Sequence, residues 1–338
     1  MQLMKAREVR LASRPSGFPT LENFEVVDVP VPEPGPGEVL VRNAYFSIEP
    51  YMRGRMNAIK SYVPPFEVGQ PMTGGTVGKI VASHAPEFPV GTWVQSELGW
   101  REYAVGPAKF FRKIDVSQTP PSAYLGILGS QGLTAYVGLH DIGGLRPDDV
   151  VFISSAAGAV GSIAGQLAKH AGATVIGSAG SAEKVAYLKN ELGFDAAFDY
   201  HDGETKARLA HLSPDGITLY FDNVGGEQLE GALSVLRPFG RIIACGMISQ
   251  YNVPTPGPRN LAQVIGKRLT LRGFIVLDHQ ARWKDYLSEA IPLVREGKLK
   301  LAESVVEGIA NAPQAFLDFL RGGKYLGKLL VQTHEDRS

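Results

Sequence analysis

The chain has 338 residues, enough for two domains, and its 34 basic and 34 acidic side chains leave no net charge. A balanced chain without basic blocks gives no reason to expect nucleic acid or a membrane as a partner, and no run approaches the ~20 apolar residues of a membrane span. The single cysteine, Cys245, excludes an intrachain disulfide, and residues 1–20 lack the apolar stretch of a signal peptide, so a cytoplasmic protein is expected.

The first part of the chain, up to about residue 125, is rich in Pro and Gly and has little helical periodicity. Short strands are predicted at 38–42, 78–83, 92–95 and 101–105, with a turn at 34–37. This region is expected to form a compact, mostly β domain.

From about residue 126 helical and strand patterns alternate. The apolar run that starts at residue 150 is predicted to be the first strand of this part. Further strands are predicted at 173–178, 196–200, 217–222, 241–245 and 269–274. Helices are predicted at 163–170 and 182–192. This alternation is typical of an α/β fold with a doubly wound parallel sheet. A last strand, 327–331, is expected to return to the first domain, so the domains are predicted as 1–125 with about 300–338, and 126–299.

The most informative segment is 150–162, where an apolar run stops at small residues and a helical pattern follows. It reads Gly-x-Gly-x-x-Gly with Ala156 in the first position and Gly158 and Gly161 in the other two. Small residues let the backbone approach a pyrophosphate, and a helix N-terminus offers free N–H groups and a positive dipole end. Because the strand and the helix that the motif requires are both present, the segment predicts a dinucleotide site.

The end of the second strand of this unit favours NADP(H). An NAD enzyme usually places Asp or Glu there to bind the ribose 2′-hydroxyl. Residues 177–181 contain no acid, and Lys184 follows within reach of a 2′-phosphate. A solvated helix lysine is the plain alternative for Lys184.

Six segments distributed along the whole chain carry a resemblance to a known family: 49–56, 132–136, 156–162, 180–185, 220–226 and 245–252. Together and in this order they resemble the medium-chain dehydrogenase/reductase superfamily, in the zinc-independent branch of leukotriene B4 dehydrogenase/prostaglandin reductases, plant double-bond reductases and bacterial curcumin-reductase-like enzymes. The resemblance implies a Rossmann domain, a GroES-like domain and a homodimer, with the strand at 269–274 as the candidate dimer edge. One cysteine cannot form a four-cysteine zinc lobe, and the seven histidines lack paired ligand spacing, so no metal is expected.

The resemblance also implies which residues bind the cofactor. Lys184 and Tyr200 match positions that hold the adenosine 2′-phosphate and ribose. One departure stands out: Tyr325 precedes Leu-Gly-Lys where relatives often have Asn. The positions that match family cofactor contacts are Ala156, Ala157, Gly158, Ala159, Val160, Gly161, Lys184, Tyr200, Asn223, Cys245, Gly246, Met247, Ile248, Ser249, Gln250, Tyr251, Phe274, Ile275 and Val276.

The activity that the resemblance implies is NADPH-dependent reduction of the C=C bond of α,β-unsaturated aldehydes or ketones. Hydride goes to the β-carbon, negative charge develops on the carbonyl oxygen, and a hydroxyl can stabilise that charge. Tyr251 is the first candidate donor and Tyr51 the second. The nicotinamide ribose hydroxyl competes with both, and a packing role for either tyrosine is the alternative.

Other interpretations stay open at this stage. A quinone reductase would share the architecture, and an NADPH-binding structural or sensor protein with little turnover would share the cofactor site. Arg53 and Arg55 would either attract an acidic substrate tail or be solvated or paired. The natural substrate is not determined by these patterns.

Overall fold

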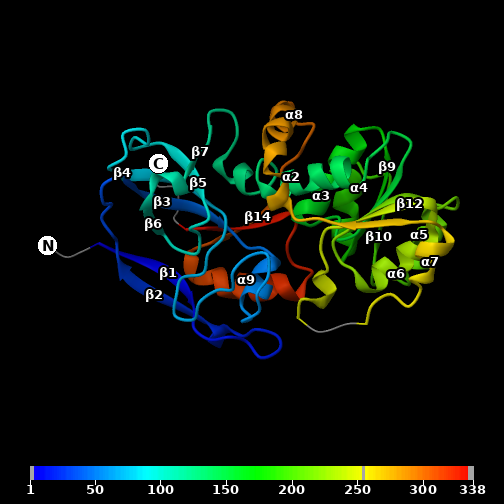
Figure 1. Cartoon of the computed structure of the whole chain (residues 1–338), viewed down its shortest axis with the longest axis horizontal. Helices are drawn as coiled ribbons and strands as arrows, with labels where there is room; N and C mark the ends of the chain where they lie inside the picture. The colour runs from blue at the N-terminus through cyan, green and yellow to red at the C-terminus, as the bar shows by residue number, and fades with distance from the viewer. Residues whose placement is uncertain (1–3, 253–255, 334–338) are drawn as a thin grey trace. The chain divides into compact units, whose positions relative to one another are not determined.

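The computed structural model describes residues 4–252 and 256–333. The chain divides into two compact units (Figure 1). The first comprises residues 1–125 and 303–338, and the second comprises residues 126–302.

The first unit is mostly β. Its seven-stranded sheet has the order β14-β15-β3-β4-β5-β7, with β6 paired to β3, and β1 and β2 form a separate antiparallel pair. Its strands are β1 (Lys5–Leu11), β2 (Phe24–Pro30), β3 (Glu38–Ser47), β4 (Thr76–Ser83), β5 (Trp93–Ser96), β6 (Tyr103–Pro107), β7 (Arg112–Lys113), β14 (Glu303–Glu307) and β15 (Lys328–Gln332). Its helices are α1 (Tyr51–Arg55), α9 (Ala312–Arg321) and the short 3-10 turns Leu21–Asn23, Ala108–Phe110, Pro121–Leu125 and Ile309–Asn311.

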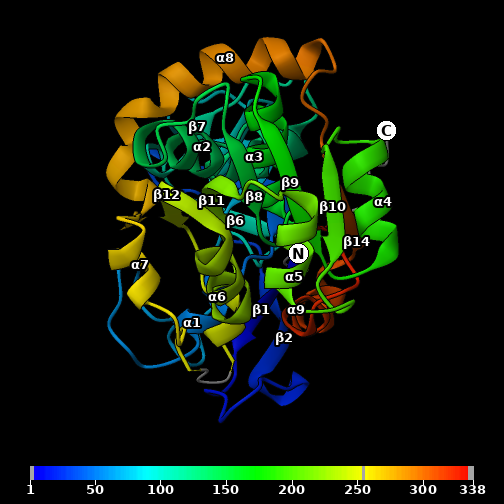
Figure 2. The ribbon, with the colours of Figure 1, turned by 90° about the vertical axis from the view of Figure 1, so that its right-hand side faces the viewer.

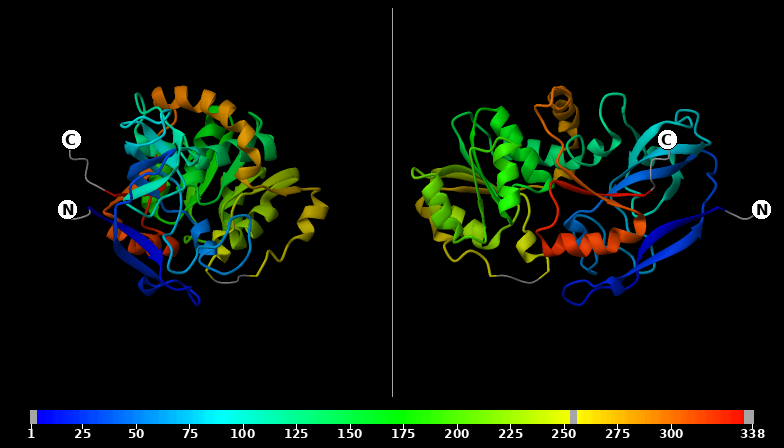
Figure 3. Two further views of the ribbon diagram at one scale, coloured as in Figure 1. Left: turned by 60° about the vertical axis from the view of Figure 1, so that its left-hand side comes forward. Right: turned by 180° about the vertical axis from the view of Figure 1, so that it is seen from behind.

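The C-terminal segment completes the first unit, as Figure 3 shows by its red strands beside the blue ones. β15 pairs antiparallel with β3, with Leu330 opposite Ser47, and parallel with β14. Apolar residues of α9 then pack with the N-terminal strands in a core that contains Phe46, Trp100 and Phe316. Residues separated by more than 250 positions therefore share one core.

The second unit is built on a parallel sheet of six strands in the order β10-β9-β8-β11-β12-β13. Numbered along the chain from β8, this is the order 3-2-1-4-5-6 of the dinucleotide-binding fold. Figure 2 shows strands of this sheet in sequence from β12 through β11, β8 and β9 to β10. The strands are β8 (Val150–Ile153), β9 (Thr174–Ala179), β10 (Ala196–Asp199), β11 (Ile217–Asp222), β12 (Leu236–Ala244) and β13 (Thr270–Gly273).

Helices cover both faces of this sheet, with α3 and α4 on one side and α5 and α6 on the other (Figure 1). Apolar runs with period 3.6 form these helices and bury one side of each against the strands. The helices are α2 (Ser130–Val137), α3 (Ala159–His170), α4 (Ala182–Asn190), α5 (Thr205–Leu212), α6 (Gly226–Val235), α7 (Ala262–Gly266) and α8 (Trp283–Arg295). Shorter helical segments are Gly138–Ile142, Ile248–Gln250 and Val276–Arg282.

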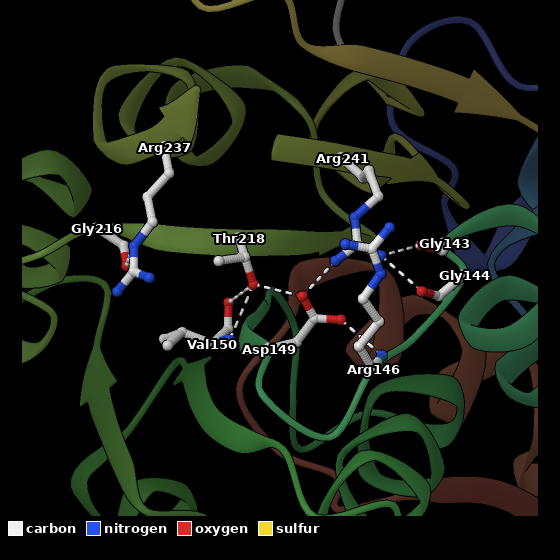
Figure 4. Close-up of polar contacts among 9 residues, drawn as sticks. All are labelled: Gly143, Gly144, Arg146, Asp149, Val150, Gly216, Thr218, Arg237 and Arg241. Atoms are coloured by element: carbon white, nitrogen blue, oxygen red, sulfur yellow. Dashed lines mark hydrogen bonds and ion pairs between the residues drawn. The ribbon is translucent and has the colours of Figure 1, made fainter. Parts of the chain in front are cut away.

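A buried ion pair ties the amino ends of three strands together (Figure 4). Asp149, just before β8, pairs with Arg241 of β12. The Thr218 hydroxyl of β11 donates to Asp149 at 2.7 Å, and the Arg146 N–H donates to the second carboxylate oxygen at 2.8 Å. Arg241 also donates to the carbonyls of residues 143 and 144, at 2.7 and 2.6 Å. These contacts lie at the edge opposite the strand ends that usually bind ligands, so they stabilise the sheet.

Several features differ from the sequence expectations: β7 and β14 were not predicted, and the second unit ends at residue 302, where 299 was expected. The strands β1 and β2 were not predicted, because one face of their hairpin is solvated and charged side chains interrupt the apolar pattern. The strand predicted at 269–274 as an apolar run is the four-residue β13, and all four of its residues are exposed. Among the described residues, no helix is both long and apolar enough to cross a membrane.

Candidate active site

The turn between β8 and α3 is the centre of the candidate site. α3 begins at Ala159 after Gly158, whose extended backbone (φ −83°, ψ 176°) makes it the N-cap. The first N–H groups of a helix have no partner within it, so those of residues 159–161 are available to an anion. The Ala156 N–H donates to the Ser178 carbonyl at 2.9 Å, which holds the turn against the end of β9.

The close contact between α3 and this turn requires glycine. A Cβ added at Gly161 would lie 2.8 Å from Cα of Ala156 and closer still to the Ser155 carbonyl oxygen. A Cβ at Gly177 of β9 would lie 2.8 Å from Cβ of Ala156. Ser155 itself has a positive φ of 49°, a conformation that non-glycine residues adopt mainly at functional turns. The turn is therefore a backbone cradle of the kind that fits a pyrophosphate.

Lys184 and Tyr200 flank the next turn, after β9. Ser181 caps α4 by accepting the Lys184 N–H at 3.2 Å, so the lysine lies in the first turn of that helix. Burial lowers the pKa of Lys184, opposed by Glu183. The Tyr200 hydroxyl lies 3.1 Å from the position of a Cβ on Gly180. The two side chains that were predicted to hold the 2′-phosphate and ribose thus border the same turn.

A polar network joins the carboxyl ends of β8 and β11, where the strand order reverses. The Asn223 side-chain amide donates to the Ser154 carbonyl at 2.8 Å, and the Asn223 N–H donates to the Ser154 hydroxyl at 2.9 Å. Asp222 accepts the Tyr220 hydroxyl at 2.7 Å and the Gly225 N–H at 2.8 Å. Burial raises the pKa of Asp222, and these donors oppose the effect. These hydrogen bonds hold the turn after β11 next to the turn between β8 and α3.

The loop after β12 is held by this same turn. The N–H groups of Cys245 and Gly246 both donate to the Asp222 carbonyl, at 2.9 and 3.0 Å. The Ile248 N–H donates to the Asn223 carbonyl at 3.3 Å, and the Ser249 hydroxyl donates to the Val224 carbonyl at 2.6 Å. Residues 245–251, predicted as one cofactor-side loop, therefore border the strand end that carries Asn223.

The titratable groups of this loop are neutral at physiological pH. Burial raises the pKa of Tyr251, a neighbouring Met247 N–H lowers it, and Cys245 raises it. The Tyr251 hydroxyl lies 3.6 Å from the Cβ position of Gly246, which places it over the start of the loop. Burial and the nearby Asp222 raise the pKa of the Cys245 thiol to about 12. Tyr251 is therefore available as a hydrogen-bond donor, whereas Cys245 is a poor nucleophile.

Phe274, Ile275 and Val276 follow β13, the outermost strand on this side of the sheet, and all three are half-buried. The Phe274 ring lies edge-on to His279, with 6.1 Å between ring centroids, and 3.3 Å from the Cβ position of Gly138. Their backbone groups continue the same carboxyl edge of the sheet that holds the other predicted cofactor residues.

Tyr51 belongs to the first unit, where it is the first residue of α1. Its hydroxyl shares a hydrogen bond with the Arg55 side chain. Burial, followed by Glu49 and Glu97, raises its pKa well above the usual value, which keeps the hydroxyl protonated. Tyr325, named above as a departure from the expected Asn, packs its ring against the apolar core of the first unit.

Three residues of this site were not named by the sequence patterns. Ser154 and Asp222 form the network at the strand ends, and Gln228 of α6 accepts the buried Ser178 hydroxyl at 2.5 Å. A signal for the first two was present, because polar residues that directly follow buried parallel strands collect at the ligand-binding edge. No sequence pattern connects Ser178 to Gln228.

Two family descriptions match the chain. Residues 7–114 match the N-terminal domain of oxidoreductase, and residues 159–292 match zinc-binding dehydrogenase. Within the described residues, no group of three His, Cys, Asp or Glu side chains is arranged to hold a metal ion.

Full-length relatives resemble the chain in sequence and in structure. The 2-alkenal reductase (NADP(+)-dependent) of Nicotiana tabacum is 41% identical, over 98% of each chain. The NADPH-dependent curcumin reductase of Escherichia coli is 39% identical, over 99% of each chain. The crystal structure of CurA from Vibrio vulnificus in complex with NADPH is 40% identical with a TM-score of 0.92, and covers 98% of this chain and 100% of that one.

Proposed function

Because this chain belongs to the medium-chain dehydrogenase/reductase superfamily, in the branch of prostaglandin, alkenal and curcumin reductases, we propose that it reduces the C=C bond of α,β-unsaturated aldehydes and ketones with NADPH. Within this branch it is an NADP-dependent double-bond reductase. The observation that carries the proposal is the Gly161 cradle at the sheet edge where Lys184, Tyr200 and Asn223 follow the carboxyl ends of β9, β10 and β11.

The cofactor site fits NADPH in two respects. Gly161 lets α3 begin in close contact with the turn, where a Cβ would meet the Ser155 carbonyl oxygen and Cα of Ala156, and the first N–H groups of the helix suit a pyrophosphate. Lys184 lies in the first turn of α4, and no carboxylate of the described residues forms an ion pair with its amine, which suits a 2′-phosphate. NADPH, when bound, supplies the hydride. We assign the second unit to cofactor binding and the first, GroES-like unit to the substrate.

The protein's part in the reaction is to stabilise negative charge on the substrate carbonyl oxygen. A neutral tyrosine hydroxyl is a suitable donor, and the raised pKa of Tyr251 keeps it protonated. Tyr251 ends the loop whose first residues donate to the Asp222 and Asn223 carbonyls, and its own N–H donates to the Ile248 carbonyl at 3.3 Å. We propose Tyr251 as the first donor and Tyr51 as the second, with the cofactor ribose hydroxyl as the competing group.

We further propose that the protein forms a homodimer through the edge of its six-stranded sheet. β13 is the outer strand of its sheet, and Leu271 in it is 43% exposed. Ile265 and Phe239, which precede it, are 82% and 68% exposed. Pairing of this edge in a homodimer would cover it. Light scattering should give twice the 36.4 kDa chain mass, and the chain mass at micromolar concentration would contradict the dimer.

A cytoplasmic location suits a chain that has no second cysteine for an intrachain disulfide.

One experiment tests the activity against its rivals. NADPH oxidation is followed with a panel of enones and enals and a matched panel of quinones, before and after exhaustive EDTA treatment. We expect turnover of enones that exceeds that of quinones and survives the chelator. Preference for quinones would favour a quinone reductase. NADPH binding without turnover on either panel would favour the structural or sensor role. Loss of activity in EDTA that added zinc restores would contradict the metal-free mechanism.

A further inference from the structure

The ends of β9 and β10 lie side by side at the carboxyl edge of the six-stranded sheet. The two strands pair in parallel with Asp199 opposite Ala179, and the Tyr200 N–H donates to the Ala179 carbonyl at 3.0 Å. Gly180, the residue after β9, therefore lies beside Tyr200, the residue after β10. In dinucleotide-binding folds the end of the second strand, here β9, contacts the 2′ oxygen of the adenosine ribose. A side chain that lies over Gly180 is thus placed to distinguish the 2′-phosphate of NADPH from the 2′-hydroxyl of NADH.

The Tyr200 ring occupies this position. A Cβ on Gly180 would lie 3.1 Å from both Cε1 and the hydroxyl oxygen of Tyr200, so the glycine leaves room for the ring. Tyr200 is 37% exposed, which leaves it accessible to a ligand. Partial burial, followed by the charge of Asp199, raises the pKa of Tyr200 above its usual value. The hydroxyl is therefore protonated and can donate to a phosphate oxygen.

His201 packs against the Tyr200 ring and is itself tethered. The two ring centroids are 4.1 Å apart, with 40° between the ring planes. The Asp199 carboxylate lies 2.9 Å from Nδ1 of His201, and the same oxygen accepts the His201 N–H at 3.0 Å. An ionised carboxylate can only accept hydrogen bonds, so Nδ1 carries the proton. Asp199 thus fixes the imidazole ring that contacts Tyr200.

Packing, not charge, is what His201 contributes. A positive charge on the imidazole is balanced within the pair, because the Asp199 carboxylate is in direct contact with it. The ring, by contrast, restricts the side chain of Tyr200 before a ligand arrives. A side chain that is already held in its binding conformation loses less conformational entropy when it binds.

We propose that His201 is a positioning residue for coenzyme selection: tethered by Asp199, it holds the Tyr200 ring over Gly180, where the Tyr200 hydroxyl binds the 2′-phosphate of NADPH. This inference deepens the proposed function and rests on its assignment of Tyr200 to the cofactor. Hydrogen bonds to a charged phosphate are stronger than those to a hydroxyl. Loss of the positioning contact should therefore weaken the binding of 2′-phosphorylated ligands selectively.

The test uses two adenosine ligands that differ only in the 2′-phosphate, adenosine 2′,5′-bisphosphate and 5′-AMP, and measures their Kd by titration calorimetry. One aromatic packing contact corresponds to roughly a two- to tenfold change in Kd. We expect His201→Ala to raise the Kd of the bisphosphate by this factor and to leave the Kd of 5′-AMP within twofold. His201→Phe keeps an aromatic ring and should lose less affinity for the bisphosphate than His201→Ala. An equal loss would contradict the packing role.

The matched control is His211→Ala, the same change at an exposed position of α5, which should bind both ligands like the wild type. The His201 side chain is 61% exposed, so its replacement leaves the buried core of the unit unchanged. Thermal unfolding checks that each variant is folded. Should His201→Ala not fold, His201→Gln, which also lacks the aromatic ring, replaces it with the same expected loss.

A double-mutant cycle tests whether His201 acts through Tyr200. Tyr200→Phe removes the hydroxyl and should itself raise the Kd of the bisphosphate. Adding His201→Ala to this variant should then change the Kd by less than twofold, because the hydroxyl that His201 positions is already absent. Additive losses would show that His201 acts independently of Tyr200 and would overturn the inference.

The outcomes separate the inference from the proposed function. A wild type that binds the bisphosphate no tighter than 5′-AMP, or whose preference Tyr200→Phe leaves unchanged, would refute the cofactor assignment of the proposed function. A preference that Tyr200→Phe weakens but His201→Ala does not, or that His211→Ala weakens equally, would refute the role of His201 alone.

Discussion

Replacing Gly161 by alanine tests whether the start of α3 holds the cofactor. The new Cβ would lie 2.8 Å from Cα of Ala156, whereas carbon atoms in contact are about 3.5–4.0 Å apart. The helix and the turn must therefore separate by roughly 0.7–1.2 Å. Overpacking of this kind costs about 1–3 kcal/mol of folding stability. The same movement withdraws N–H groups from the pyrophosphate, and a hydrogen bond to a charged group contributes about 1.5–3 kcal/mol.

These magnitudes predict that Gly161→Ala raises the Kd for NADPH about 10- to 100-fold. Titration calorimetry measures the affinity, and thermal unfolding confirms that the variant is folded at the assay temperature. The control is Gly266→Ala in α7, where an added Cβ meets nothing within 4 Å, and it should bind NADPH like the wild type. A folded Gly161 variant that binds NADPH within twofold of the wild type would refute the assignment of the cradle.

Three further variants test the other parts of the site and the fold. Lys184→Ala should raise the KM for NADPH about tenfold or more and leave NADH use nearly unchanged, because it removes a charge-assisted contact to the 2′-phosphate; equal efficiency of the wild type with both coenzymes would contradict this. Tyr251→Phe should lower kcat and kcat/KM together by about 10- to 100-fold with little change in NADPH affinity, as expected of a donor that acts mainly in the transition state. Full kcat in that variant, with hydride transfer rate-limiting, would move the donor role elsewhere. Asp149→Asn should destabilise the protein by about 3 kcal/mol in urea unfolding, because it leaves the largely buried Arg241 without its counter-charge; an unchanged unfolding midpoint would show that the pair is dispensable.

The amino-acid sequence by itself determined the local pieces of the cofactor domain. The run from residue 150 to 162 predicted a strand, a small-residue turn and a helix, and β8 and α3 are found there. Short connections and right-handed crossovers leave few ways to arrange alternating strands and helices, so the doubly wound sheet followed from the pattern. The strand at 217–222 was predicted with the bounds of β11. Local spacing is enough here because each βα turn brings together residues that are neighbours in the chain.

Tertiary structure alone decided which side chains meet across the first unit. Glu49 and Lys328, whose side chains pair at 3.0 Å, are separated by more than 250 positions, and no local period connects them. They become neighbours because β3 pairs with β15, in a distant pairing whose register only the folded sheet defines. The same holds for Arg53, whose guanidinium donates at 2.7 Å to the Gly17 carbonyl, 36 positions away in the chain. A sequence pattern reports the charge of a side chain, but pairing and burial determine whether that charge is available to a substrate.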